Sequence, residues 1–549
     1  IACLFNLETT ASHIAGINMR YDYVGQDPNI SSNVIYKITV TAYRFCTGSA
    51  YTCGARGQEI YAKCTSSGAQ LGPITLTQKS FIARPGDRPN FRGARDVSNV
   101  CKNQQTSCEV RGGVNGYEAY LWEGQISLPK CTNWQIAGTS CTCCSNGFGN
   151  IWSGGGGNNI WVIDINTNWS PAGSSTASKN CAPKFFNEDR PFPNACVGQK
   201  IVFAGGAFDN DGDSLRYQMV CPWSAVGSAG RPAFTRMTPR GAGISCSTPM
   251  PGFTIDGSTG LMTVTPTTVG GFLCAYEVAE YERCTGLFKG RSYREIVINV
   301  ATCANKVPVD KSGISNITGR ATLITPYKLE VCNGDLITWD DTLIDPDRGD
   351  TLKVLTNLNS IMPNAKMDII STGQRNSIVV RFTWRAVMGK DPIKHFFISF
   401  SDDNCGIPGN GHSSFELDVK SSISAGVEQY VCKGDTVFLK GFGSNLFKWK
   451  SLNGNPLVTG VNWFPDTNIG VDTNKFVKFV PIKTTTLLVE ASSARDLCGG
   501  IVQSCFLKDT MTINVSQAYQ IKVPNDSLIC YPAAGSLTVN PSKNNLNSA

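Results

Sequence analysis

Two groups of aspartates stand at the same distance after a cysteine. Asp209 follows Cys196 by thirteen residues, and Asp345 follows Cys332 by thirteen residues. Carboxylates crowded into one loop repel each other unless a cation or backbone N–H groups compensate them, and Ca²⁺ takes roughly six to eight oxygen ligands. Both groups are therefore candidate Ca²⁺ sites. The candidate ligands are Asp209, Asp211, Asp213, Asp345, Asp347 and Asp350.

The competing interpretation of each group is a turn without a metal. Asp side chains commonly accept hydrogen bonds from backbone N–H groups a few residues ahead, and such turns need no cation. The spacing is not that of an EF-hand, because Gly212 stands at the fourth position and no glutamate follows at the twelfth.

No arrangement typical of an enzyme accompanies these aspartates. The three histidines, His13, His395 and His412, stand far apart, and the sequence has no G-x-S-x-G, H-E-x-x-H, P-loop or dinucleotide-binding motif. His395 opens a strand-like segment and is expected to be structural. Tyr120 and Trp122 could form a sugar-stacking face, although strand aromatics more often pack in the core or across strands. We therefore predict a protein that is not an enzyme and has no catalytic residues.

The elements that must position these side chains are strands. The phrase Cys-x-Gly, followed by a polar residue and an apolar extended stretch, occurs at Cys196, Cys332 and Cys432, and the sequence after Cys530 resembles it. Copies roughly a hundred residues apart, made of short alternating segments, have the size of immunoglobulin-like sandwiches. Strict alternation over residues 34–43 predicts a half-buried strand, and no segment carries a sustained helical period.

We therefore predict an all-β fold of tandem immunoglobulin-like or cadherin-like β-sandwich domains. The apolar start of the chain, followed by small residues, is typical of the tail of a signal peptide. The expected divisions are a signal-peptide remnant at 1–11, a cysteine-rich N-terminal β domain at 12–185, an immunoglobulin-like or cadherin-like domain at 186–302, an immunoglobulin-like domain at 303–421, an immunoglobulin-like or PKD-like domain at 422–516 and the start of a further domain at 517–549.

The composition favours an extracellular protein. The 549 residues include 23 cysteines that are dispersed rather than grouped as metal ligands, which indicates disulfides and an oxidising environment. The net charge of +7 is spread without a run of like charges, so a nucleic-acid partner is not expected. No apolar stretch is long enough for a membrane span. The candidate disulfides are Cys332 with Cys405, Cys432 with Cys498 or Cys505, and Cys196 with Cys274 or Cys284.

Several phrases, in this order, resemble the large secreted surface proteins of gliding bacteria, which are called gliding-motility-associated or adhesin-like and contain tandem immunoglobulin-like and PKD-like domains. The resemblance covers about residues 12–515. It departs at Asn210, where the family usually has Pro, and at Ser145, where Arg is common. The phrases include Ser12-His-Ile-Ala-Gly16, Thr41-Ala-Tyr-Arg-Phe-Cys-Thr-Gly48, Tyr120-Leu-Trp-Glu-Gly-Gln-Ile-Ser-Leu-Pro129, Cys143-Cys-Ser-Asn146, Pro191-Phe-Pro-Asn-Ala-Cys-Val-Gly-Gln199, Phe208-Asp-Asn-Asp-Gly-Asp-Ser-Leu215 and Ser401-Asp-Asp-Asn-Cys405.

This resemblance implies a non-catalytic adhesin-like protein of the bacterial cell surface, exported by the type IX pathway. Its sandwiches would form a stalk for attachment or gliding-associated adhesion, with a glycan or protein as the surface ligand. Two alternatives stay open. The domains could be carbohydrate-binding or accessory modules of a larger secreted enzyme, or the chain could self-associate as the subunit of a surface filament through exposed sheet edges.

Overall fold

The computed structural model describes most of the chain between residues 14 and 516. The predicted divisions at 1–11 and 517–549 lie outside the described residues. The described ranges are 14–46, 58–81, 94–98, 100, 104–110, 113, 116–142, 150–152, 158–168, 179–186, 193–226, 233–239, 241–389, 391–404, 407–444, 446–465, 475–491, 494–495, 501–502 and 508–516.

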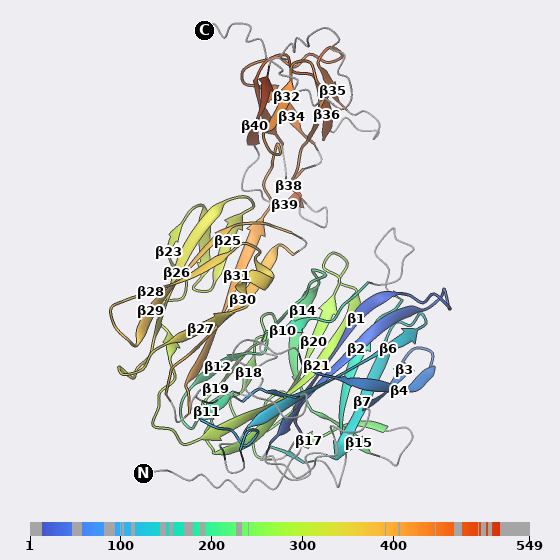
Figure 1. Cartoon of the computed structure of the whole chain (residues 1–549), viewed down its shortest axis with the longest axis vertical. Helices are drawn as coiled ribbons and strands as arrows, with labels where there is room; N and C mark the ends of the chain where they lie inside the picture. Colours follow the sequence, from blue (N-terminus) through green and yellow to red (C-terminus); the bar gives the residue numbers. More distant parts are fainter. Residues whose placement is uncertain are drawn as a thin grey trace, which may run out of the picture. The chain divides into compact units, whose positions relative to one another are not determined.

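The fold is all-β, as predicted (Figure 1). In the described ranges the only helix is α1 (Leu358–Ile361), a single turn. The chain divides into two compact units, one made of Ile1–Val331 with Asp335–Val419 and one made of Cys332–Gly334 with Lys420–Ala549. The first unit contains three sets of strands, and the second contains one.

The first set of strands closes into a ring, which we call the N-terminal ring. Its order is β21-β1-β2-β6-β4-β3-β7-β9, and β9 pairs again with β21. Strand β2 carries the predicted alternation, since Val34, Tyr36, Ile38 and Val40 are buried. The strands of this region are β1 (Ile14–Gln26), β2 (Val34–Phe45), β3 (Gln58–Cys64), β4 (Gln70–Lys79), β5 (Arg95–Asp96), β6 (Tyr117–Leu128), β7 (Trp134–Thr142), β8 (Ile151–Trp152) and β9 (Asn158–Ile165).

The second set, β10 to β21, forms the second sandwich. Strands β14, β20, β21 and β11 face the small sheet β12-β19-β18, and Phe203, Met262 and Tyr276 pack between them. The strands are β10 (Lys184–Phe185), β11 (Asn194–Cys196), β12 (Ile201–Ala204), β13 (Ala207–Phe208), β14 (Ser214–Val220), β15 (Trp223–Val226), β16 (Ala233–Arg236), β17 (Thr238–Pro239), β18 (Thr254–Ile255), β19 (Leu261–Val264), β20 (Gly270–Tyr281) and β21 (Phe288–Ala301).

Strand β21 belongs to both the N-terminal ring and the second sandwich. Asn18 of β1 pairs with Arg294 near the middle of β21, whereas β11 pairs with residues 299–301 at its end. Most of this strand is buried, which fits a position covered on both faces. One sheet therefore runs across the boundary predicted between residues 185 and 186.

The third set, β22 to β31, forms the third sandwich. Sheet β22-β26-β29-β28, joined by β23, faces sheet β24-β25-β31-β30-β27. Trp339 stacks on Phe382 and Phe396 stacks on Phe415 in the core. The strands are β22 (Val309–Asp310), β23 (Ser315–Thr318), β24 (Ala321–Thr325), β25 (Lys328–Cys332), β26 (Leu336–Ile344), β27 (Lys353–Thr356), β28 (Lys366–Ser371), β29 (Ser377–Arg385), β30 (Ile393–Ser401) and β31 (Asn410–Lys420).

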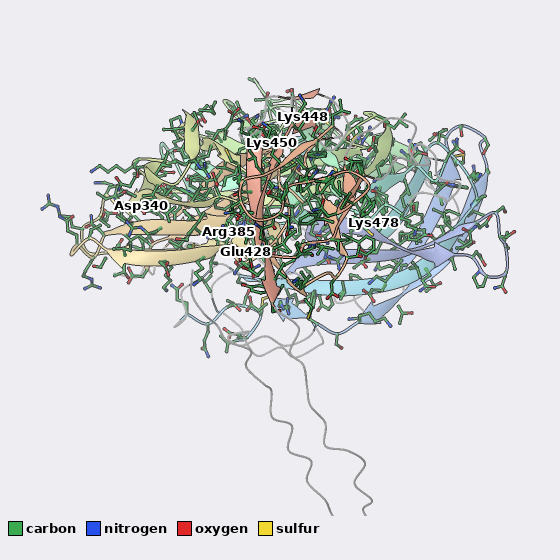
Figure 2. The ribbon with its side chains drawn as sticks, turned by 90° about the horizontal axis from the view of Figure 1, so that it is seen from above. Asp340, Arg385, Glu428, Lys448, Lys450 and Lys478 are labelled. Atoms are coloured by element: carbon green, nitrogen blue, oxygen red, sulfur yellow. A yellow bond between two sulfur atoms is a disulfide. The ribbon has the colours of Figure 1, made fainter. Side chains whose placement is uncertain are left out.

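The second unit contains the fourth sandwich. Sheet β32-β40-β37-β34 faces sheet β33-β36-β35 across Trp463, Phe479 and Leu487. Lys450 on β34 and Lys478 on β36 mark the two sheets in Figure 2. The strands are β32 (Gln429–Cys432), β33 (Val437–Lys440), β34 (Lys448–Ser451), β35 (Trp463–Pro465), β36 (Phe476–Phe479), β37 (Thr485–Glu490), β38 (Ala494–Arg495), β39 (Ile501–Val502) and β40 (Lys508–Ser516).

The repeated Cys-x-Gly phrase is a turn that takes the chain from one sheet of a sandwich to the other. It links β11 to β12, β25 to β26 and β32 to β33, and each pair of strands belongs to different sheets. Gly198, Gly334 and Gly434 have φ of 77°, 95° and 85°. Only glycine adopts this region without a steric penalty, which explains why the phrase recurs.

The disulfides differ from the predicted pairs. Cys196 bonds Cys303, and Cys274 is a free, buried thiol, so the prediction of Cys196 with Cys274 or Cys284 is wrong. Cys432 is also free and exposed, in contrast to its predicted pairing. Cys332 is disulfide-bonded, but its predicted partner lies outside the described residues. The other bonds between described cysteines are Cys46–Cys108, Cys64–Cys131 and Cys221–Cys246.

Candidate functional site

The first aspartate group occupies the loop between β13 and β14. Asp209 Oδ1 accepts hydrogen bonds from the backbone N–H groups of Asp211 and Asp213, at 2.8 and 3.1 Å. Asp211 Oδ2 accepts one from the N–H of Cys181, at 2.7 Å. The loop is therefore an Asp-capped turn, as in the competing interpretation without a metal. The Asp211 carboxylate accepts its hydrogen bond from a residue outside this turn.

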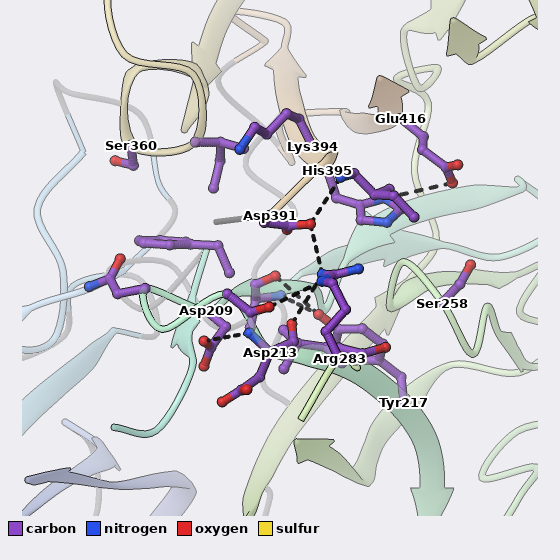
Figure 3. A pocket seen from close by; sticks show the side chains of 18 residues that line it. Asp209, Asp213, Tyr217, Ser258, Arg283, Ser360, Asp391, Lys394, His395 and Glu416 are labelled. Carbon is purple, nitrogen blue, oxygen red and sulfur yellow. Dashed lines mark hydrogen bonds and ion pairs between the residues drawn. The ribbon is translucent and has the colours of Figure 1, made fainter. Parts of the chain in front are cut away.

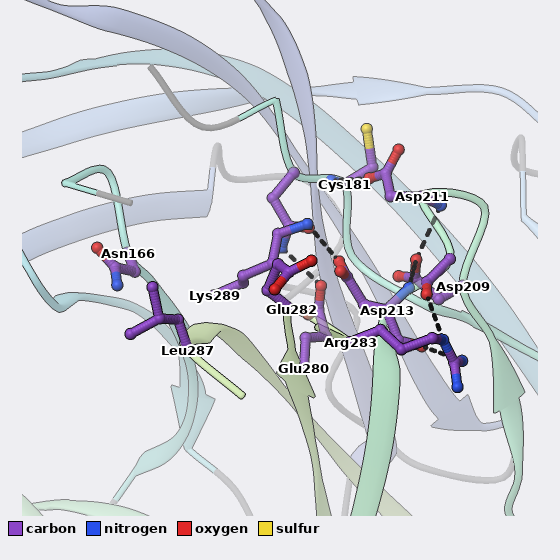
Figure 4. Close-up of polar contacts among 12 residues, drawn as sticks. Asn166, Cys181, Asp209, Asp211, Asp213, Glu280, Glu282, Arg283, Leu287 and Lys289 are labelled. Carbon is purple, nitrogen blue, oxygen red and sulfur yellow. Dashed lines mark hydrogen bonds and ion pairs between the residues drawn. The ribbon is translucent and has the colours of Figure 1, made fainter. Parts of the chain in front are cut away.

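A glutamate that the sequence did not single out completes this group (Figure 4). Glu280, on β20, is fully buried, and its oxygen lies within 4.8 Å of those of Asp209 and Asp213. Tyr21 Oη donates to Glu280 Oε1 and Asn180 Nδ2 donates to Oε2, both at 2.7 Å. The only signal in the sequence is a carboxylate within a mostly apolar strand.

Interactions within the fold offset the negative charge of the first group. Lys289 is buried, and its Nζ donates to Asp213 Oδ2 at 2.5 Å. Burial, together with the nearby Asp209, raises the pKa of Glu280 well above its ordinary value. Burial and then Asp213 raise the pKa of Asp209 to about 6. The ammonium group of Lys289 therefore offsets part of the negative charge of this group, and burial disfavours the ionised form of Glu280.

The second aspartate group follows β26 and is not neutralised in this way. Asp345 is 0% exposed, and its Oδ1 accepts the backbone N–H of Asp347 at 2.7 Å. Oδ2 of Asp345 and Oδ2 of Asp350 are buried and have no hydrogen-bond partner among the described residues. Suitable oxygens of Asp345, Asp347 and Asp350 lie within 4.8 Å of one another. The structure thus brings together all three residues predicted for this group.

Two further residues surround the second group. Asp402 accepts hydrogen bonds from Asn305 Nδ2 at 2.8 Å and from the N–H of Gly409 at 2.9 Å. Asn305 is buried, and its Oδ1 has no partner in the described part of the chain. Burial raises the pKa of Asp345 to about 6, and the negative charge of Asp402 adds to this rise. Asp402 belongs to a phrase noted in the sequence, whereas Asn305 carried no signal.

The cation beside the second group is remote and solvated. Lys306 Nζ lies 3.9 Å from Asp347 Oδ1, and the Lys306 side chain is 61% exposed. An exposed ion pair of this length contributes little. The unpartnered carboxylate oxygens of Asp345 and Asp350 therefore fit a hard divalent cation, for which oxygen is the preferred ligand. Of the two predicted groups, the second has the donor set that fits Ca²⁺.

The aromatic residues considered for sugar stacking are not available for it. Tyr120 and Trp122 on β6 are buried in the core of the N-terminal ring and stack on each other, with ring centroids 5.9 Å apart.

His395 is half-buried on β30, and burial lowers its pKa. No helix in the described residues has the length and apolar character to cross a bilayer.

No protein-family model matches the sequence, and no curated protein matches it. Solved structures align with it at low similarity. An ICAM-5 D1–D4 ectodomain fragment is 10% identical, with 91% of this chain and 100% of that chain covered and a TM-score of 0.19. Zebrafish RET cadherin-like domains 1 to 4 are 10% identical, with 66% and 82% covered and a TM-score of 0.14. At these scores the similarities carry no argument, and the fold assignment rests on the strand pairing described above.

Proposed function

We propose that the chain is a non-catalytic, adhesin-like protein of the bacterial cell surface, in which tandem β-sandwiches form a stalk that carries tension to a surface ligand. Export by the type IX pathway and a role in gliding-associated attachment belong to the same proposal and are supported by the resemblance of the sequence phrases. The disulfides of the described residues are typical of extracellular proteins and fit this location.

The observation that carries this proposal is the parallel pairing of an early strand with the last strand in two of the sandwiches. In the second sandwich β11 runs parallel to the end of β21, with Asn194 opposite Asn299. In the fourth sandwich β32 runs parallel to β40, with Gln429 opposite Ile513. Because paired parallel strands point the same way, the chain comes into each of these sandwiches at one end and leaves it at the other.

Parallel end strands suit a protein under tension. A pull on the two ends loads all hydrogen bonds of the pair together in shear, whereas a peeling geometry would break them one at a time. In the second sandwich the Cys196–Cys303 disulfide lies at the end of this pair and links residues 107 apart in sequence. Tension would pass through this covalent bond and bypass the intervening residues.

Force spectroscopy on the full chain, tethered at its two ends, tests this proposal. Replacing Cys196 and Cys303 together with serine is expected to add up to about 28 nm of released contour length under load, because the bypassed residues become extensible except for those that the Cys221–Cys246 disulfide still closes off. The matched control is Cys274→Ser, which changes a free thiol in the same sandwich. Equal released lengths for the wild type and the double variant would contradict the load-bearing role.

We also propose that Ca²⁺ binds the second aspartate group, with Asp345, Asp347 and Asp350 as ligands. The support is the pair of buried carboxylate oxygens without hydrogen-bond partners. A bound divalent cation would offset the repulsion within the loop and stiffen the region where Asn305 and Lys306 precede the third sandwich. The first group, including Asp209, Asp211 and Asp213, is better explained as a polar network held by Lys289.

A further inference from the structure

A cavity of about 440 Å³, whose wall combines apolar and charged side chains, lies between the second and third sandwiches (Figure 3). The second sandwich contributes the loop around Asp209 and the side chain of Arg283, and the third contributes Lys394, His395 and Glu416. A cavity of this size is within the range of small-molecule sites, and it lies at an interface between domains, where such sites are frequent.

Most charged groups of the cavity wall are already paired within the protein. Arg283 Nη2 lies 2.7 Å from Asp391 Oδ1. Lys328 Nζ, from outside the cavity, lies 2.6 Å from Glu416 Oε1. Asp213 is held by Lys289, as described above. Within each pair the positive and negative charges offset each other, so the paired groups present little net charge to a ligand.

Among the lysine and arginine side chains of the cavity wall, Lys394 is the exception. It is 8% exposed, and among the described residues it has neither a hydrogen-bond acceptor nor a carboxylate at ion-pair distance. Burial lowers the pKa of Lys394, which reflects the unfavourable desolvation of its ammonium group, while Asp391 partly opposes this. A buried cation without a partner is costly, so a negatively charged ligand group beside it would be favourable.

The cavity also contains acceptors for hydroxyl groups. Asp209 Oδ2 is buried and has no hydrogen-bond donor in the described part of the chain. Glu416 presents a second carboxylate on the opposite side, and His395 lies next to it, with Nδ1 3.9 Å from Glu416 Oε2. Carboxylates accept hydrogen bonds from the hydroxyl groups of a polyol, whereas they repel a second anion.

We propose that this cavity binds a sugar acid, a ligand that carries one carboxylate together with several hydroxyl groups. Its carboxylate would pair with Lys394, and its hydroxyls would donate to Asp209 and Glu416. A single uronic acid residue is small enough for the cavity, so the terminal residue of an acidic glycan is the ligand class that fits. This inference rests on the proposed adhesin-like role, because it names the chemistry of the surface ligand.

Saturation-transfer NMR and titration calorimetry on the full chain test the proposal, with glucuronic acid as the probe and glucose as its neutral counterpart. We expect glucuronic acid to bind at least 10-fold more tightly than glucose. Lys394→Met should abolish this preference, whereas Lys353→Met, which removes an exposed lysine of β27, should leave it unchanged.

Two further measurements distinguish a loss of binding from a loss of folding. Lys394→Met removes an unpaired buried charge, so its Tm should equal or exceed that of the wild type, and Lys394→Arg should retain part of the preference for the acid. Equal binding of glucose and glucuronic acid, no binding of glucuronic acid at millimolar concentration, or wild-type binding by folded Lys394→Met would each overturn the inference. If the binding tests fail while the Cys196/Cys303 double variant still releases more contour length than the wild type, the load-bearing role stands without this inference.

Discussion

Arg283 Nη2 lies 2.7 Å from Asp391 Oδ1 and so joins the second sandwich to the third. The same guanidinium donates through Nε to the carbonyl oxygen of Gly212, at 3.2 Å. Gly212 belongs to the loop that carries the first aspartate group. Arg283 therefore ties that loop to the neighbouring sandwich, and its contacts define one side of the cavity between the two sandwiches.

A double-mutant cycle on this pair should reveal a measurable coupling. We expect Arg283→Ala and Asp391→Ala to be non-additive by about 0.5–1 kcal/mol, because both groups are only partly exposed. The coupling should decrease at high salt, where screening weakens the pair. Denaturant unfolding of the two single variants and the double variant measures it, and strictly additive effects would show that the contact contributes nothing.

Calcium should stabilise the chain through the second aspartate group alone. At a Ca²⁺ concentration about 100-fold above the dissociation constant, the expected gain is about 2.7 kcal/mol. Asp345→Asn should abolish this gain because it removes a buried ligand oxygen, and it should be more stable than the wild type in chelator because it removes repulsion. Thermal melts with and without Ca²⁺ measure both effects.

Asp209→Asn is the matched control for the calcium experiment. It changes the corresponding residue of the first group, where Lys289 already holds Asp213. We expect this variant to keep the full Ca²⁺-dependent rise in Tm. A wild-type Tm that does not change with millimolar Ca²⁺ would discard the metal proposal, and loss of the rise in Asp209→Asn would place the ion in the first group.

Asp341 should make stability fall as the pH rises. Burial, reinforced by the neighbouring Asp310, raises the pKa of Asp341 to about 9. The folded chain therefore keeps a proton that the unfolded chain releases near its ordinary pKa of about 4. The stabilisation from this proton is complete below about pH 4 and is lost progressively as the pH rises to about 9, by at most about 1.4 kcal/mol per pH unit.

Asp341→Asn resembles the protonated acid in shape and should flatten this dependence. Unfolding free energies measured between pH 5 and pH 9 should then decline less steeply than in the wild type. Asp368→Asn, a change at an exposed aspartate of β28, should follow the wild-type curve. Parallel curves for the wild type and Asp341→Asn would mean that Asp341 is ionised in the fold.

The long disulfide should stabilise more than the short one in the same sandwich. Cys196–Cys303 closes a loop of 107 residues, whereas Cys221–Cys246 closes one of 25. Loop-closure entropy gives losses of about 4.8 and about 3.5 kcal/mol on replacing the long and the short pair, respectively, with serine. Denaturant unfolding of the two double variants compares them. Equal losses would indicate that strain or residual structure, rather than loop length, sets their contribution.

Some features followed from local patterns and could be predicted. The alternation of residues 34–43 gave strand β2, since a period of two places one set of side chains in the core. Asp345, Asp347 and Asp350 also lie close together as the spacing suggested, because residues within one short loop are neighbours whatever the rest of the chain does, while their role as metal ligands stays a prediction. The recurrence of Cys-x-Gly located the turns between sheets.

Other features depended on contacts between distant segments. The partner of Cys196 was misassigned because Cys303 is brought close by the parallel pairing of β11 with β21, and strand order cannot be deduced from spacing. Glu280 joined the first aspartate group from another strand for the same reason.

The sequence by itself determined that this protein consists of strands joined by glycine turns, with aspartates crowded into two loops, because these properties depend on residues close together in the chain. The tertiary structure decided which aspartate loop lies against a buried lysine, which cysteines meet, and that β21 belongs to both the N-terminal ring and the second sandwich. Those outcomes depend on packing between residues far apart in the sequence, and no local sequence pattern encodes such packing.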